Sequence, residues 1–187
     1  MPHYTLAMIK INFDSTYEPI EIADNLSFMT FTSIDKKGNE ILLKIEIKPV
    51  EDPLLPNVFN MAFGPLSEVG NIDDKAKINH SDINKMFSTI IFFALVFLQA
   101  NPENTIGIDG SDDTRAYLYH RMFLSNREFL NEYFVAIGVD WYVRLLRNGN
   151  VEVDSNGLPF FKPKPEAFDY LRPVTDLYRY YMFYLRQ

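Results

Sequence analysis

The sequence predicts an α+β protein in which a twisted, mostly antiparallel sheet packs one face against two main helices. Three observations support this fold class. Apolar and polar residues alternate through residues 26–34 and 40–50, as is typical of strands. Residues 81–100 carry apolar side chains at helical spacing. Ile106 and Ile108 indicate a short buried strand that turns through Gly110 and Ser111 into a second helical segment.

The first half of the chain is expected to supply much of the sheet. Residues 4–13 alternate in part and predict a first strand. Residues 26–34 and 40–50 flank a polar turn containing Gly38, so we expect them to pair as a hairpin. Residues 58–63 predict a further strand. One face of the hairpin is apolar and the other is half charged, as in an antiparallel sheet with one solvated face.

Helices are predicted over residues 81–100 and 112–124. Ser81 is a suitable N-cap for the first, and after its first turn this helix is apolar almost all round, which predicts a buried central helix. The residues expected in the core are Phe87, Ile91, Ala94 and Leu98. A capping-box pattern at residues 125–128 predicts a third, short helix.

The last quarter is expected to return to strands. Residues 134–137 and 141–146 predict two strands joined around Gly138. Four prolines predict an irregular segment over residues 157–175. Residues 178–185 are aromatic at five of eight positions, which favours a final strand.

The length of 187 residues and the hydrophobic fraction of 47% predict a single domain over residues 1–187. Residues 1–150 are expected to form the core sheet and helices. Residues 151–187, rich in proline and aromatic residues, are expected to close the sheet or to form an interface.

The composition argues against several classes of function. A net charge of −7 without a basic cluster argues against nonspecific nucleic-acid binding. The chain has no cysteine, and its three histidines (His3, His80 and His120) lack the spacing of metal ligands, so no metal site is predicted. The longest apolar run has nine residues, whereas a membrane helix needs about twenty. We therefore expect a cytoplasmic protein with no membrane association and no cofactor.

The first candidate site is the corner between the strand at 106–109 and the helix at 112–124. A helix N-terminus presents free backbone N–H groups, which suit an anion. The candidate ligand-binding residues are Lys85, Asp109, Gly110, Ser111, Arg115 and Tyr119. Two interpretations remain open: Ser111 and Arg115 hold a phosphate or carboxylate, or Ser111 only caps the helix and Arg115 pairs with a nearby acid. Lys85 either reaches a pocket between the two helices or lies in a solvated first turn.

The second candidate site is the aromatic tail. Five aromatic rings in residues 178–185 exceed what one face of one strand can hide, so we expect at least two of them at an interface. The candidate interface residues are Tyr178, Tyr181, Phe183 and Tyr184. The alternative is an aromatic strand covered by the proline-rich segment.

Two patterns of the chain point to a known family. The helix start N-x-x-D-x-x-K-x-x-x-T-[VI] is formed here by Asn79, Asp82, Lys85, Thr89 and Ile90. The corner G-S-x-x-x-R-x-x-L-Y is formed by Gly110, Ser111, Arg115, Leu118 and Tyr119. With this order and spacing, residues 58–140 resemble an uncharacterised bacterial domain-of-unknown-function family. The resemblance implies a small cytoplasmic protein with the fold of that family.

Two classes of function are therefore expected. The first is a non-enzymatic module that binds a partner protein or a second copy of itself, for instance in a toxin–antitoxin or phage-defence operon. The second is an enzyme or sensor that binds a phosphate-bearing small molecule or a nucleic-acid end at the Gly110-Ser111 corner. A pocket holding Lys85 and Arg115 would favour the second class.

Overall fold

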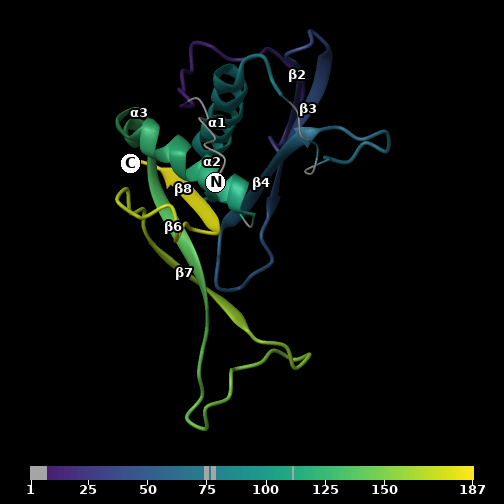
Figure 1. Cartoon of the computed structure of the whole chain (residues 1–187). Coiled ribbons are helices and arrows are strands. Elements are labelled where there is room, and N and C mark those ends of the chain that lie inside the picture. The colour runs from purple at the N-terminus through teal and green to yellow at the C-terminus, as the bar shows by residue number, and fades with distance from the viewer. Residues whose placement is uncertain (1–7, 74–75, 77–78, 111) are drawn as a thin grey trace.

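The chain folds into one mixed, mostly antiparallel sheet with three helices, which confirms the predicted α+β class (Figure 1). This computed structural model describes residues 8–73, 76, 79–110 and 112–187. The eight strands lie in the order β1-β2-β3-β4-β5-β8-β6-β7, and of these neighbours only β4 and β5 run parallel. Their bounds are β1 Pro19–Ile22, β2 Phe28–Ile34, β3 Glu40–Pro49, β4 Val58–Pro65, β5 Thr105–Asp109, β6 Phe134–Val143, β7 Phe161–Ala167 and β8 Tyr180–Leu185.

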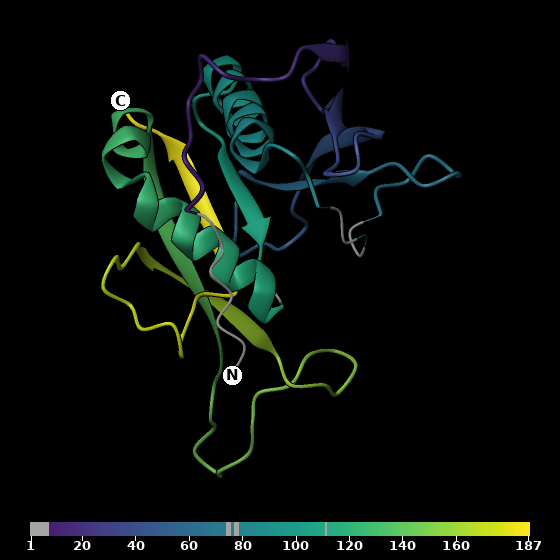
Figure 2. The ribbon, with the colours of Figure 1, turned by 45° about the horizontal axis from the view of Figure 1, so that its top comes forward.

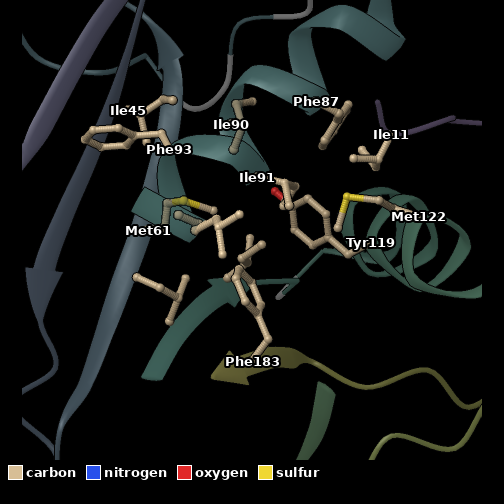
Figure 3. Packing of buried hydrophobic residues seen from close by; sticks show 14 of the residues in the cluster. Ile11, Ile45, Met61, Phe87, Ile90, Ile91, Phe93, Tyr119, Met122 and Phe183 are labelled. Carbon is tan, nitrogen blue, oxygen red and sulfur yellow. The ribbon is translucent and has the colours of Figure 1, made fainter. Parts of the chain in front are cut away.

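The helices α1 (Ile83–Ala100), α2 (Asp113–Ser125) and α3 (Arg127–Tyr133) pack on one face of this sheet, as predicted for the two main helices (Figure 2). The four residues expected in the core of α1 are buried. Figure 3 shows side chains of α1 and α2 meeting Phe183 of β8 in one apolar cluster. By length and composition α1 could cross a bilayer, but 61% of it is buried inside the protein. That burial is typical of the central helix of a folded domain.

The helix caps differ from two predictions. Asp82, not Ser81, caps α1: its carboxylate accepts a hydrogen bond of 2.8 Å from the backbone N–H of Lys85. Asp112 caps α2 in the same way. The capping box expected before α3 is wrong, because the helix begins after Asn126 without a side-chain cap bond. The Asn126 side chain binds the N-terminal segment instead.

No strand forms in the described part of the predicted segment 4–13, from residue 8 onward. Residues 10–12 donate their backbone N–H groups to the side chains of Asn84, Asn126 and Ser88 on the helical layer. Because these side chains satisfy the backbone, the segment needs no partner strand. It runs along the helices, and the edge strand is β1.

The prediction of an irregular segment over residues 157–175 is also wrong, because β7 lies within it. Pro163 and Pro165 are two apart, so both missing N–H groups lie on the same side of β7. Since β7 is the edge strand beside β6, that side can face away from the ladder, where proline is tolerated. The two strands predicted around Gly138 are one continuous strand, β6.

The predicted final strand is confirmed as β8. It lies in the interior of the sheet, between β5 and β6. Tyr178, Tyr181 and Phe183 are all buried, whereas Tyr184 is 38% exposed. The expectation of several exposed rings is therefore wrong for three of the four interface candidates. Both faces of β8 are covered: Tyr181 and Phe183 join the helix-side core, and Tyr180 and Met182 join a smaller cluster on the opposite face.

Two glycines in neighbouring strands provide the space for these rings. A Cβ atom at Gly107 would overlap Tyr180, and one at Gly138 would overlap the ring of Tyr178. Each ring thus packs directly on the backbone of a glycine in a neighbouring strand. The space that a side chain would take is filled by the ring, so no cavity is left.

We predict a pH dependence of stability from His120, which is buried against Phe168. Burial lowers the pKa of His120, and the positive charges of Arg121 and Arg172 lower it further, whereas Asp169 opposes them. Since the unfolded chain takes up this proton first, the free energy of unfolding should fall as the pH drops below about 6.5. Urea unfolding between about pH 7.5 and pH 5.5 should show this loss, and His120→Gln should flatten it. An equal slope in the variant would assign the loss to other groups.

Candidate functional site

A cleft of about 320 Å³ lies between β4, α1 and α2. Its floor is apolar, and its wall from α1 includes Phe87 and Ile90. The polar side chains along it are Asn60, Asp73, His80, Asp109, Arg115 and Tyr119. This volume is at the lower end of the range for small-molecule sites.

Arg115 and Asp112 form the charged pair at the α2 end of the cleft. The Nε atom of Arg115 lies 3.1 Å from Asp112 Oδ2, and the Arg115 backbone N–H donates to Asp112 Oδ1 at 2.9 Å. This geometry confirms the prediction that Arg115 turns back toward the corner and pairs with an acid. The same carboxylate thus caps the helix and orients the guanidinium.

Two titratable side chains in the cleft lining, Tyr119 and His80, have shifted pKa values that favour their neutral forms. Burial raises the pKa of the Tyr119 hydroxyl; Arg115 opposes this shift, and Asp109 and Asp112 add to it. Burial lowers the pKa of His80, while Asp35 opposes the shift. The Nδ1 atom of His80 lies 2.8 Å from Ser33 Oγ. At neutral pH the cleft therefore offers an un-ionised phenol and an un-ionised imidazole.

The structure brings together three of the six ligand-binding candidates: Asp109, Arg115 and Tyr119 all line the cleft. Lys85 does not join them. Its Nζ atom lies 4.6 Å from the centre of the Tyr17 ring, in a cation–π contact outside the cleft lining. The expected convergence of Lys85 with Arg115 is therefore wrong.

The two remaining candidates form the corner itself. Gly110 is buried, and a Cβ atom there would lie 3.0 Å from the Tyr181 ring and 3.2 Å from the Ala116 backbone. This glycine thus permits close packing of β5 against α2. Ser111 lies outside the described residues, so its predicted role as anion ligand stays a prediction. Its predicted role as the helix cap is wrong, because Asp112 is the N-cap of α2.

Nearly half of the large exposed hydrophobic residues in the described part of the chain lie in a segment that was not predicted as a site. Beyond its pairing with β8, β6 continues with β7 into a hairpin that projects from the body (Figure 1). We call residues 141–165 the arm. Nine of the twenty large exposed hydrophobic residues found in the described chain lie in this arm. They are Trp141, Tyr142, Leu145, Leu146, Val151, Val153, Leu158, Phe160 and Phe161.

One signal in the sequence could have revealed the arm. Asn148-Gly149 and Asn156-Gly157 are hairpin-type turns, and apolar residues flank both. Isolated bridges pair Leu145 with Val151 and Val153 with Pro159 around these turns. The four prolines of residues 157–175 argued against strands, so no hairpin was predicted there.

The arm is tied to the body at its base. Arg172 contacts Asp140 and Glu166 at 2.9 and 3.2 Å, and its guanidinium lies 3.9 Å from the centre of the Tyr178 ring. Tyr178 also donates a hydrogen bond of 2.8 Å to Glu166. Because Asp140 belongs to β6 and Glu166 to β7, this cluster fixes both strands where the arm leaves the sheet.

Within the described residues, no group of three His, Asp or Glu side chains is placed to hold a metal ion. A family model described as a family of unknown function, DUF6934, matches residues 14–152. No curated protein and no solved structure matches the chain. Since the family model covers more than half of the sequence, the chain belongs to the DUF6934 family, which confirms the predicted resemblance to a domain-of-unknown-function family.

Proposed function

We propose that this member of the DUF6934 family is a non-enzymatic protein-binding module of the cytoplasm, and that the arm forms its binding surface. The observation that carries the proposal is the group of nine exposed hydrophobic residues in the arm. Leu145 at the tip is 72% exposed and Phe161 is 58% exposed. Apolar surface concentrated in one place marks an interaction site, because leaving it in water is unfavourable.

The residue types of the arm support a protein as the ligand. The arm carries the single tryptophan of the chain, Trp141, together with Tyr142 and two phenylalanines. Aromatic residues are enriched in the cores of protein interfaces, and arginine is enriched with them. Arg144 and Arg147 are exposed beside the apolar tip. The tail proposed from the sequence offers only Tyr184 for this role.

The arm also has internal contacts that reduce its freedom before binding. Lys162 and Glu152 form an ion pair of 2.7 Å across the hairpin, and Lys162 lies 4.9 Å from the centre of the Phe160 ring. Together with the Arg172 cluster at its base, these contacts restrain the arm. A binding surface that is ordered in advance loses less conformational entropy on association.

The proposal can be tested by placing a photo-crosslinking amino acid at position 161 and irradiating the cells that produce the protein. We expect discrete covalent adducts with protein from position 161. The matched control is position 171, since Leu171 is 92% exposed but lies outside the arm. Adducts of the same size and yield from both positions, or none from position 161, would contradict the proposal.

A second function is supported by the cleft. Asp109, Arg115 and Tyr119 stand at one end of an apolar cavity, which suits a small molecule with an apolar body and a phosphate end. Calorimetric titration with a nucleoside monophosphate tests it: binding should be lost in Arg115→Gln and kept in Lys85→Gln. Equal binding by both variants, or no binding by the wild type, would contradict the phosphate site.

A further inference from the structure

The geometry points to a second copy of this chain as the protein that docks on the arm. This inference rests on the proposed function and names the partner. We infer a two-fold symmetric dimer in which each arm lies on the sheet face of the other copy that carries no helix. Four features of the described residues support it: the continuity of that face, a groove in it, the distribution of charge and the size of the arm.

The first feature is an apolar face that runs without interruption from the body onto the arm. Val139, Trp141 and Val143 of β6 share one face because side chains alternate along a strand. Their partners across the ladder are Pro165, Pro163 and Phe161 of β7. Val139 packs with Tyr180 and Met182 in the cluster on the face opposite the helices. Both ribbon views show the three helices on the other side of the sheet (Figures 1 and 2).

The second feature is an open groove where the arm meets the body. It has a volume of about 620 Å³. Val50, Leu55, Trp141 and Tyr180 supply its apolar walls, and Asn60, Asp109 and Arg179 supply its polar lining. Trp141 therefore belongs both to the groove and to the arm. The apolar arm and the groove that can receive it lie on the same face of the same sheet.

The third feature is the distribution of charge. The arm contains four basic residues, Arg144, Arg147, Lys162 and Lys164, and two acidic residues, Glu152 and Asp154, so its net charge is +2. With −7 on the whole chain, the rest carries −9. The arm therefore carries charge opposite in sign to that of the rest of the chain, which favours its contact with the body of another copy once the two copies have met.

The fourth feature is size and symmetry. A two-fold interface uses the same surface on both copies, so each copy must supply both the inserted part and the receiving part. Here both parts lie on one face. The arm has 25 residues, so part of it together with the receiving face can supply the roughly 20–30 residues that a stable interface uses on each side.

Light scattering on the purified full chain tests the inference. We expect the mass of two chains at high concentration and dissociation on dilution. Phe161→Asp places a charge on the apolar face of the arm and should weaken the dimer at least about tenfold. The double variant Arg144→Glu/Arg147→Glu should weaken it as well, and this change affects exposed side chains that the fold does not need. Leu171→Asp is the matched control and should leave the dimer unchanged.

The outcomes separate this inference from the proposed function. A wild-type chain that stays monomeric at its highest soluble concentration overturns the dimer, as does a dimer that survives both sets of arm substitutions. If a monomer still gives adducts with another protein from position 161, the arm binds a different partner and the proposed function stands. If neither a dimer nor adducts form, both are wrong. Circular dichroism of each variant confirms that the fold is retained.

Discussion

Phe183→Ala is expected to lower the free energy of unfolding by about 3–5 kcal/mol, the usual cost of removing a large buried ring. Phe183 is 1% exposed, and its ring centre lies 5.0 Å from that of Phe134 and 5.9 Å from that of Phe123. The substitution therefore leaves a cavity where β8, β6 and α2 meet. Close packing around it limits how far the site can collapse.

The neighbouring residue Tyr184 provides the matched control for this substitution. It lies on the same strand but points to the opposite face and is 38% exposed. Tyr184→Ala should therefore cost less than about 1 kcal/mol. Urea unfolding followed by circular dichroism measures both values. Equal losses for the two variants would show that β8 does not lie between β5 and β6 with this orientation.

Gly138→Ala is expected to destabilise the protein by about 1–3 kcal/mol, the usual cost of overpacking a filled site. The added methyl group would overlap the ring of Tyr178. That ring cannot move freely, because Tyr178 is fully buried, bonded to Glu166 and stacked against Arg172. In a strand without such a neighbour, replacing glycine by alanine would leave the stability unchanged or raise it. A loss of stability in Gly138→Ala would therefore come from the contact with the Tyr178 ring.

A double-mutant cycle with Tyr178→Leu isolates this contact. In the Tyr178→Leu background the ring is absent, so Gly138→Ala should cost markedly less. Unfolding in urea of the wild type, the two single variants and the double variant gives the coupling. The same cost of Gly138→Ala in both backgrounds would mean that the methyl group meets something other than the Tyr178 ring.

The sequence predicts well those elements whose pattern is local. In β2 and β3 the buried side chains alternate along the strand, and in α1 they recur at helical spacing. Each pattern lies within a few consecutive residues, so it can be recognised from a short stretch of sequence. The pairing of Arg115 with an acid was also predictable, because Asp112 lies three residues away on the same helix turn. These are interactions over a few residues.

Features that depend on distant residues could not be predicted. The segment before β1 reads as a strand, but its hydrogen bonds come from Asn84 and Asn126, more than seventy residues away. The aromatic residues of the tail were expected to be exposed, because the glycines that make room for their rings lie in other strands.

The same limit applies to the candidate site. The direction of Arg115 was predicted correctly from its position one turn into the helix, close to several acids. The direction of Lys85 was not, because it depends on the tertiary position of Tyr17. The arm was missed because the prolines of β7 oppose a strand unless the strand lies at an edge.

The most direct test of the central claim, that the arm is a protein-binding surface, uses its only tryptophan. In purified protein labelled with 5-fluorotryptophan, the single fluorine resonance reports on Trp141 at the base of the arm. We compare the dilute protein, the concentrated protein and the dilute protein in unlabelled extract of the producing cells. The account predicts that the resonance shifts or broadens in at least one of the last two samples, and that Phe161→Asp abolishes the change. An identical resonance in all three samples, or the same change in Phe161→Asp, would contradict it.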